Sequence, residues 1–268
     1  MTIQELSGPW GAARVAELGG CVLSWQPAGH GEVLFLSRDA QLTPGSMWHG
    51  GIPVCAPWFG QGRGDWQVPH GHGLVSRVPW HTETVENLDD GATVVLTLPA
   101  TQTAHLPGAS RYPADLAYRL EITVGAAALT VALTITSPTQ DVTVDVALHP
   151  YFRLNTTGTT LTGLEGVGFQ DALRDWATGT AEAPLAFGEH LDLVFDAAPP
   201  LFLSDGETTL RLATSSANRT VVWNPGPASR ELSAEWDQFV CVEYGNVREG
   251  AITIPAGGAH TMSMTVEL

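Results

Sequence analysis

Apolar residues occupy every second position through much of the middle of the chain. Between residues 116 and 124 these positions hold Leu116, Tyr118, Leu120, Ile122 and Val124. The same alternation runs through residues 129–135 and resumes through residues 142–148. A period of two residues is typical of a half-buried β-strand. We therefore predict an antiparallel meander in this part of the chain.

Shorter runs of the same kind occur over residues 14–18, 21–26, 33–36, 92–98, 209–212, 220–223, 238–243, 251–254 and 261–267. The helix signals are few: residues 228–236 could form two turns opened by Ser229. About a dozen strands in one open sheet would twist and curl, so we predict an all-β chain folded as a large antiparallel β-sandwich. No shift in composition and no repeat marks a linker, and we expect one domain over residues 1–268.

Composition narrows the possible chemistry. The 268 residues are 44% apolar, which is enough to bury a core, and all 12 basic residues are arginine. Without lysine the chain cannot form a Schiff base or supply the lysine of a P-loop. The 28 acidic residues give a net charge of −16, which disfavours nucleic acid and anionic membranes as partners. A phosphate would have to be held locally.

The cysteines and the N-terminus indicate the compartment. Cys21, Cys55 and Cys241 are far apart, and none belongs to a C-x-x-C pair, so we expect neither a disulfide framework nor a zinc knuckle. The first ten residues have no basic region followed by an apolar core, and no segment approaches the roughly 18 apolar residues of a membrane span. We expect a soluble, cytoplasmic protein.

Two segments rich in glycine, proline, histidine and tryptophan, residues 48–60 and 69–80, interrupt the strand pattern. Proline lacks a ladder donor and glycine costs backbone entropy, so we predict shaped loops that line a site. Trp58, Trp66 and Trp80 are candidates for a sugar-stacking floor, although packing is the favoured role for each one alone.

His70 and His72 form an H-x-H pair, which suggests a metal site of the cupin type. Ser76 and Arg77 stand where the acidic ligand should follow, and a cation there would repel a metal, so we expect no metal site. The favoured hypothesis for His72 is a neutral hydrogen-bonding residue in a cleft; the alternative is a loop histidine that caps a turn.

His149 follows the last of the alternating strands. The two-residue period places it on the face opposite the apolar positions, together with Thr143, Asp145 and Ala147. A histidine at this strand end could donate a proton to a bound ligand. It could equally be a surface histidine paired with Asp145, and spacing alone leaves both alternatives open.

Glu243 lies near the end of a strand that we predict to be buried on both sides. Phe239, Cys241 and Glu243 share one face, while Val240 and Val242 share the other. A carboxylate there is either half of an ion pair with arginine or a ligand-facing base whose pKa is raised by partial desolvation. We favour the base.

Taken together, several motifs resemble one family. They are GGIPVCAPWFG (residues 50–60), HGLVSRVPW (72–80), ALHPYF (147–152), VVWNP (221–225) and VCVEYGNV (240–247). The chain resembles the hexose-6-phosphate mutarotases, also called glucose-6-phosphate 1-epimerases, of the galactose-mutarotase-like superfamily. The motifs lie in the family's order across nearly the whole chain. The resemblance implies a β-supersandwich with a sugar cleft on one sheet.

Roles follow from the resemblance position by position. It implies that His149 is the acid, Glu243 the base, His72 a cleft histidine and Asp192, in a loosely matched block, an acceptor for a sugar hydroxyl. In this chemistry a carboxylate removes the anomeric proton while an imidazolium protonates the ring oxygen. The ring opens and closes again to the other anomer. No metal or redox cofactor is implied.

The chain departs from the family where the substrate phosphate is held. His49 replaces an arginine, Gly71 replaces a glutamine, and Ser76 stands where a second arginine is usual, with Arg77 one place later. On a strand Ser76 and Arg77 would point to opposite sides, so Arg77 can substitute only if the chain bulges. Pro150 replaces a threonine and removes a hydrogen-bond donor beside His149. His49 and Arg77 therefore remain candidates for substrate binding.

These observations predict an isomerase, namely a cofactor-independent mutarotase of an aldohexose or an aldohexose 6-phosphate. One alternative is a mutarotase for non-phosphorylated aldoses, because the expected anion-binding residues are altered. Another is a carbohydrate-binding protein without catalysis. The expected partner is a small sugar or sugar phosphate, with no nucleic acid and no membrane, and we expect a monomer.

Overall fold

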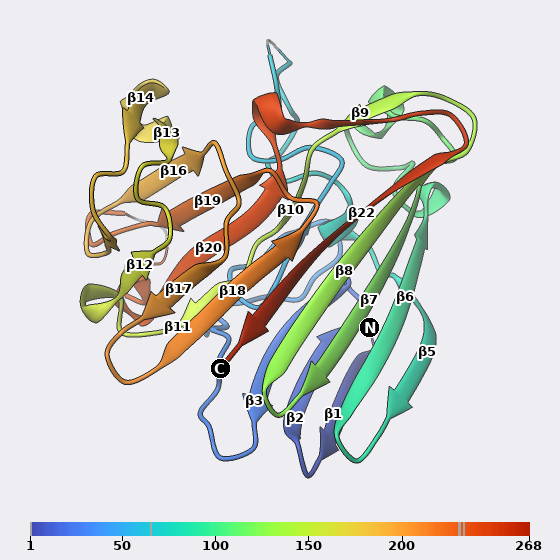
Figure 1. Ribbon diagram of the computed structural model, residues 1–268. Helices are drawn as coiled ribbons and strands as arrows, with labels where there is room; N and C mark the ends of the chain where they lie inside the picture. The colour runs from blue at the N-terminus through green and yellow to red at the C-terminus, as the bar shows by residue number, and fades with distance from the viewer. Residues whose placement is uncertain (1, 65, 230–231, 233) are drawn as a thin grey trace.

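A computed structural model describes residues 2–64, 66–229, 232 and 234–268. The described residues form antiparallel strands and short 3₁₀ turns, with no α-helix among them (Figure 1). The predicted all-β class is confirmed. None of these residues belongs to a helix long and apolar enough to span a membrane.

The first large sheet has nine strands in the order β15-β12-β17-β18-β22-β8-β7-β6-β5. Their bounds are β5 His81–Asn87, β6 Gly91–Pro99, β7 Ala117–Gly125, β8 Ala128–Ser137, β12 Thr160–Thr162, β15 Leu185–Ala186, β17 Leu201–Ser204, β18 Thr209–Ser215 and β22 Gly258–Glu267. The predicted meander forms its centre, since β6, β7 and β8 pair in sequence order.

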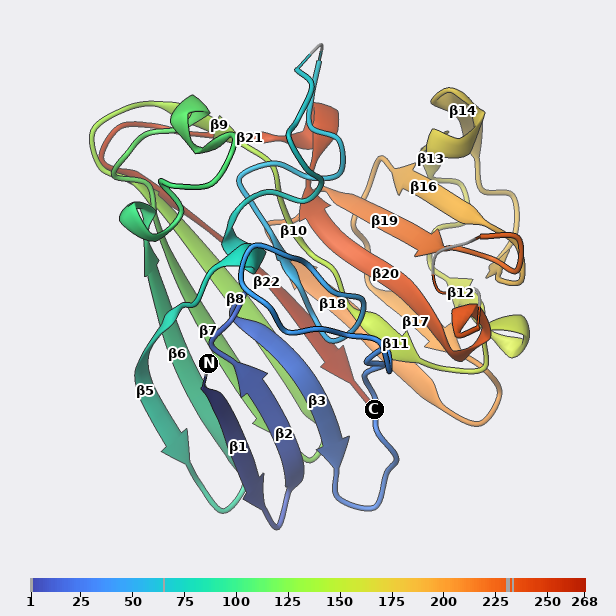
Figure 2. The ribbon, with the colours of Figure 1, turned by 180° about the vertical axis from the view of Figure 1, so that it is seen from behind.

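The second large sheet has eight strands and carries the site described below. Its order is β14-β13-β16-β19-β20-β10-β4, and β11 also pairs with β20. The bounds are β4 Val54–Cys55, β10 Val146–Leu148, β11 Tyr151–Arg153, β13 Gly168–Asp171, β14 Ala177–Thr180, β16 Leu191–Phe195, β19 Arg219–Asn224 and β20 Phe239–Asn246. Figure 2 shows β16, β19, β20 and β10 side by side.

Two small sheets complete the fold. One contains β1 Ile3–Gly8, β2 Gly11–Ala16 and β3 Cys21–Pro27, and the other pairs β9 Val142–Val144 with β21 Ile252–Ile254. The 3₁₀ turns are η1 Val75–Arg77, η2 Ala100–Gln102, η3 Ala109–Arg111, η4 Thr156–Gly158, η5 Ala172–Arg174, η6 Trp236–Gln238 and η7 Arg248–Gly250.

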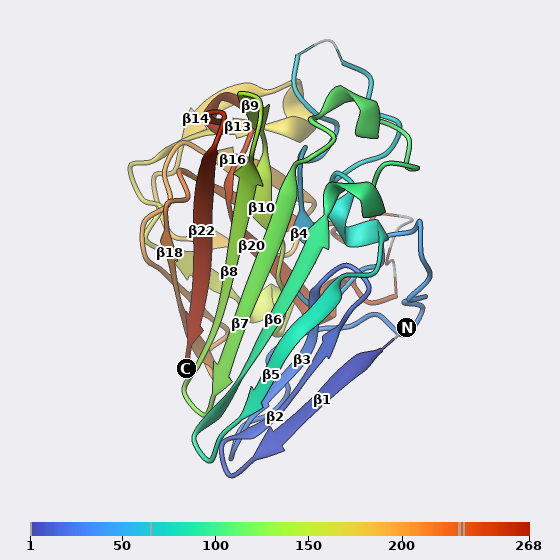
Figure 3. The same cartoon turned by 90° about the vertical axis from the view of Figure 1, so that its right-hand side faces the viewer.

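The main core lies between the two large sheets. Figure 3 shows β6, β7 and β8 in one layer, with β4, β10 and β20 behind them. Alternate side chains of both sheets, such as Leu120, Leu133, Leu148 and Val242, join one buried cluster. The other face of the eight-stranded sheet belongs to separate small clusters, one around Ala147 and Val221 and one around Tyr151 and Cys241. That outer face is therefore available for a site.

Several sequence predictions need correction. The run 142–148 is two strands: β9 pairs with β21 and β10 with β20, and the break falls at Asp145. Residues 33–36 make only isolated bridges. Of the proposed helix 228–236, residues 230, 231 and 233 lie outside the described residues, and the described remainder has turns and the start of η6. No sequence pattern predicted β1, β4, β5 or the short strands β11–β17.

Candidate functional site

A cleft with a volume of about 570 Å³ opens on the outer face of the eight-stranded sheet. The six residues predicted as site residues all line it: His49, His72, Arg77, His149, Asp192 and Glu243. They come from loops 48–60 and 69–80, the end of β10, β16 and β20. The structure thus brings together side chains from segments that are up to 194 residues apart, between positions 49 and 243.

His149 and Glu243 form the centre of the cleft. Strands β10 and β20 pair with Ala147 opposite Gly245 and Leu148 opposite Tyr244, and the continuation of this register brings His149 opposite Glu243. The His149 Nε2 and Glu243 Oε1 atoms lie 3.4 Å apart, and both side chains are almost completely buried. The alternative of a surface histidine paired with Asp145 is wrong, because Asp145 pairs with Arg63.

Burial opposes charge on both members of this pair. Desolvation, together with the nearby Asp192 carboxylate, raises the pKa of Glu243 well above its usual value. Desolvation and the neighbouring His72 lower the pKa of His149 well below its usual value. The pair therefore shares one exchangeable proton, which both shifts favour on Glu243; its transfer to His149 gives a carboxylate and an imidazolium. Such a pair can exchange protons with a bound hydroxyl.

The polar atoms facing the cleft are incompletely satisfied. His149 Nδ1, His72 Nδ1 and Glu243 Oε2 are buried and have no hydrogen-bond partner among the described residues. Buried polar atoms without partners are uncommon and mark places where a ligand can bind. The hydroxyl groups of a sugar supply both donors and acceptors, which suits this set.

His72 enters the cleft in an unusual backbone conformation. Its φ is 62°, in the left-handed region that residues other than glycine rarely adopt. The ring packs edge-on against Phe59 at 4.9 Å and against His149 at 5.3 Å between centroids. Desolvation, with smaller contributions from Arg77 and His49, lowers the pKa of His72 to about 4. His72 is therefore neutral at pH 7, while His70 turns instead to Trp58.

Arg77 reaches the cleft because residues 75–77 form a 3₁₀ turn instead of a strand. Its guanidinium donates hydrogen bonds to the main-chain carbonyls of Gly45, Gly71 and Gly73, at 2.9, 3.1 and 3.3 Å. It forms no ion pair with any residue that the structure describes. Since a guanidinium has five N–H donors, two remain for a ligand, and the positive charge is not neutralised.

Aromatic rings form the walls of the cleft, but they are not the predicted ones. Trp58 and Trp80 are buried, and their N–H groups donate to the His70 and Val75 carbonyls, which confirms their packing role. Trp66 packs edge-on against Trp58, with 5.0 Å between ring centroids, and none of the three lines the cleft. Instead the His149 ring stacks on the Tyr151 ring, with 5.0 Å between the ring centroids. The His49 ring lies nearly parallel to the Trp223 ring, with 6.5 Å between the centroids.

Asp192 lies on β16, opposite Trp223 of β19, and lines the cleft as predicted. Burial raises the pKa of this carboxyl group, and the nearby His190 and Arg248 oppose the shift. A half-buried carboxylate at this edge can accept hydrogen bonds from sugar hydroxyls.

Two further residues line the cleft that the sequence did not predict, Arg248 and Trp176. The Arg248 Cζ atom lies 3.4 Å from the Trp176 ring centroid, and its Nε donates to Gln170 Oε1 at 3.3 Å. One signal was available for Arg248, because it follows directly on the strand that carries Glu243. No sequence signal places Trp176 beside it.

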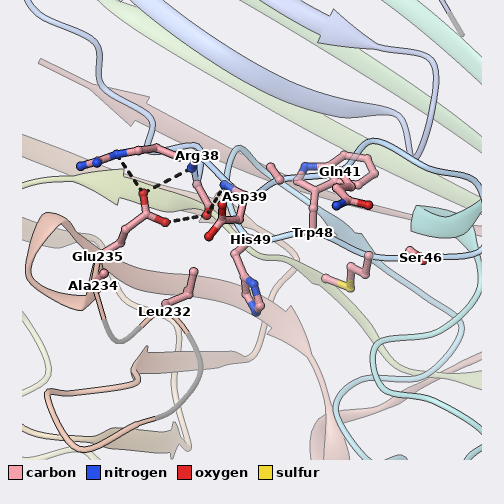
Figure 4. Close-up of a pocket in the computed structure, with 12 residues that line it drawn as sticks. Arg38, Asp39, Gln41, Ser46, Trp48, His49, Leu232, Ala234 and Glu235 are labelled. Atoms are coloured by element: carbon pink, nitrogen blue, oxygen red, sulfur yellow. Dashed lines mark hydrogen bonds and ion pairs between the residues drawn. The ribbon is translucent and has the colours of Figure 1, made fainter.

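A second pocket of about 570 Å³ adjoins the cleft, and the two share Met47, Trp48 and His49 (Figure 4). Its carboxylate, Glu235, accepts a hydrogen bond from the Ser37 hydroxyl at 2.6 Å and lies 3.5 Å from Arg38 Nε. Figure 4 shows the His49 ring pointing away from this group. The Glu235 carboxylate is thus held by polar partners of its own pocket, whereas the Glu243 carboxylate contacts His149 in the cleft.

Comparisons with known proteins agree with this geometry. The sequence profile of the aldose 1-epimerase family matches residues 4–267. The chain belongs to the aldose 1-epimerase family. It is an isomerase of the epimerase, or mutarotase, type.

Relatives and solved structures extend the comparison. Proteins of Escherichia coli and Salmonella typhimurium named "Putative glucose-6-phosphate 1-epimerase" are 29% and 26% identical, over 86% of this chain and 78% of each relative. The crystal structure of "a putative mutarotase" from Salmonella typhimurium is 25% identical, covers 98% of this chain and 89% of its own, and has a TM-score of 0.85. The predicted mutarotase-like β-sandwich is confirmed.

Proposed function

We propose that this mutarotase interconverts the anomers of an aldohexose, in particular an aldohexose 6-phosphate, with Glu243 as base and His149 as acid. The observation that carries the proposal is the 3.4 Å contact between His149 Nε2 and Glu243 Oε1 at the centre of the cleft. An acid and a base this close can act on the anomeric hydroxyl and the ring oxygen, which are bonded to the same carbon.

The proton balance of the reaction is simple. The Glu243 carboxylate takes the proton of the anomeric hydroxyl while the His149 imidazolium gives a proton to the ring oxygen, and the bond between C1 and the ring oxygen breaks. The open-chain aldehyde rotates about C1–C2, and the reverse proton transfers close the ring to the other anomer. His72, with a pKa of about 4, stays neutral and serves as a hydrogen-bond partner. Asp192 orients a hydroxyl group. No cofactor takes part in the proposed steps.

The charge of Arg77 favours a phosphorylated sugar as the substrate. Its charge is surrounded by carbonyl oxygens and is not neutralised by a described carboxylate, so it can bind an anion in a chain whose net charge is −16. His49, also on the cleft wall, is a second candidate ligand. The alternative of a free aldose as substrate is favoured by His49, Gly71 and Ser76, which replace the family's usual phosphate-binding residues.

The test is anomer interconversion, followed by polarimetry or exchange NMR. We expect the purified protein to accelerate it over buffer, with glucose 6-phosphate faster than glucose or galactose. Equal rates for phosphorylated and free sugars would favour the free-aldose alternative. Rates equal to buffer for all three sugars would overturn the proposed catalysis and leave a carbohydrate-binding protein.

We also propose that the protein is a cytoplasmic monomer, with residues 1–268 as one domain, and that neither nucleic acid nor an anionic membrane is a partner. The buried cysteines suit a reducing compartment, since burial raises the pKa of the Cys21 thiol to about 12 and keeps it unreactive. The large exposed apolar side chains, such as Leu88 and Phe202, are few. Light scattering coupled to size-exclusion chromatography tests the monomer.

A further inference from the structure

One buried carboxylate near the cleft has no role in the proposed reaction. Asp145 lies at the break between β9 and β10, and its side chain is 1% exposed. Its Oδ1 lies 2.9 Å from Arg63 Nε, and its Oδ2 accepts the Phe59 N–H at 3.3 Å. The Arg248 main-chain N–H faces this carboxylate and opposes the rise in its pKa, and the Asp145 N–H donates to the Pro57 carbonyl at 3.0 Å. We propose that Asp145 is a positioning residue that ties the loop 57–63 and Arg248 together and so sets the shape of the cleft.

The loop 57–63 connects Asp145 to the acid–base pair. Phe59, held by its N–H, packs edge-on against the His72 ring, and the Gly60 carbonyl accepts the His72 N–H at 3.1 Å. The His72 ring in turn contacts His149 at 5.3 Å. Displacement of this loop would therefore change the positions of two imidazoles in the cleft.

Arg248 connects Asp145 to another part of the cleft. Its φ is 55°, a left-handed conformation that needs support from its surroundings. Its N–H faces the Asp145 carboxylate and favours the charged form of that group. Its guanidinium then packs on Trp176, which is 40% exposed and lines the cleft. The loop 57–63 and the turn η7 are neighbours in the fold (Figures 1 and 2).

The charge of Asp145 makes this arrangement sensitive to pH. Burial raises its pKa to about 6, opposed by the Arg63 and Arg248 charges and by the N–H groups of Phe59 and Arg248; Tyr112 is the other titratable group that faces it. Because the raised pKa means that the fold favours the protonated form, acidification does not unfold the protein through this group. Protonation removes the ion pair with Arg63, so catalytic efficiency falls below about pH 6 without a loss of stability from this group.

The inference rests on the proposed mutarotase function, and its first test is Asp145→Asn. This variant keeps the size of the side chain and removes the charge. We expect kcat/KM for glucose 6-phosphate at pH 8 to fall about 10- to 100-fold, mainly through kcat, because small displacements of groups that position the reacting atoms have effects of this size. The matched control is Asp196→Asn, which removes the carboxylate of an exposed pair with Arg219 and should leave kcat/KM unchanged.

Arg63→Gln provides a readout that a purely structural role would not change. Arg63 stabilises the Asp145 carboxylate, so its removal should move the acid limb of the pH profile to higher pH, whereas Asp145→Asn should remove that limb. An unshifted limb in Arg63→Gln, or wild-type kinetics in Asp145→Asn, would overturn the inference. If Asp145→Asn does not fold, the shift in Arg63→Gln decides alone.

The positioning role of Asp145 can be tested even if the proposed mutarotase function is wrong. If the wild type shows no mutarotation, the imidazole NMR signals of His72 and His149 replace activity as the readout. Asp145→Asn should shift both signals and Asp196→Asn should shift neither. Unchanged signals in Asp145→Asn would reject the positioning role whatever reaction the cleft performs.

Discussion

The two faces of strand β20 are equally buried and chemically opposite. Every residue from Phe239 to Asn246 is buried. On the inner face Val240 and Val242 join the apolar core between the sheets, whereas on the outer face Cys241 belongs to a separate small cluster and Glu243 meets His149 in the cleft. Burial alone therefore does not show whether a side chain belongs to the core or to the site. The residues that it contacts make that distinction. The inner face should control stability, and the outer face should control activity.

Glu243→Gln should produce the largest effect. It removes the proposed base and keeps the shape, so kcat should fall by about 10²- to 10⁴-fold, the typical contribution of a positioned acid or base. Anomer exchange NMR measures the rate. Glu235→Gln, which changes a buried carboxylate of the adjoining pocket, is the matched control and should keep kcat. If the Glu243→Gln variant kept the wild-type kcat, the outer face of β20 would not control activity and Glu243 would not be the base.

Leu148→Ala tests the inner face of the same sheet on the neighbouring strand β10, where Leu148 pairs with Tyr244 of β20 and directly precedes His149. Leu148 is fully buried in the main core, so its truncation should reduce the free energy of unfolding by about 2–5 kcal/mol. The folded fraction should keep its kcat. Urea unfolding and exchange NMR on the same sample check both quantities, and a large loss of kcat in fully folded protein would contradict the separation of the two faces.

His72→Gln tests whether a histidine in the cleft makes the stability of the protein depend on pH. The pKa of His72 is about 4 in the folded protein, below the usual histidine value of 6.5, so the fold favours the neutral ring. Its contribution to stability is present above pH 6.5 and is lost as the pH falls toward 4, by about 3 kcal/mol at most. His72→Gln cannot take up this proton and should lose less stability over that interval. Unfolding free energies at pH 7 and pH 4.5 provide the measurement; equal losses in both proteins would argue against a buried neutral His72.

Arg77→Gln should have the smallest and most selective effect. Loss of a charge-assisted hydrogen bond costs about 1.5–3 kcal/mol, so KM for glucose 6-phosphate should rise roughly 10- to 100-fold. KM for glucose should hardly change, because glucose has no phosphate. Parallel kinetics on the two sugars check this, and an equal rise for both would place Arg77 in a structural role.

The strands with a regular period were predictable from sequence, and the irregular ones were not. The positions of β7 and β8 agree with the alternation within a residue or two, because each strand exposes one face and buries the other. By contrast β5, His81–Asn87, has no buried position and therefore no apolar alternation to detect. Strands β11–β17 have only two to five residues, which is too short for a period.

The site residues show the same division. A period of two residues was enough to put His149 and Glu243 on the faces where the structure places them, because strand geometry is local. The direction of Arg77 depended on the turn Val75–Arg77, which strand periodicity could not predict. Trp176 and Arg248 meet through contacts between segments far apart in sequence.

The sequence by itself determined the all-β class and the faces of the long strands, because these follow from local periodicity. It also made His149 and Glu243 candidates, and the family resemblance implied their roles as acid and base. Only the tertiary structure decided that His72, His149, Asp192 and Glu243 share one cleft, since their meeting depends on the order of strands in the sheet. It also decided their protonation. The pKa values of these groups are shifted chiefly by loss of water, and which groups lose water is known only when distant segments have packed around them.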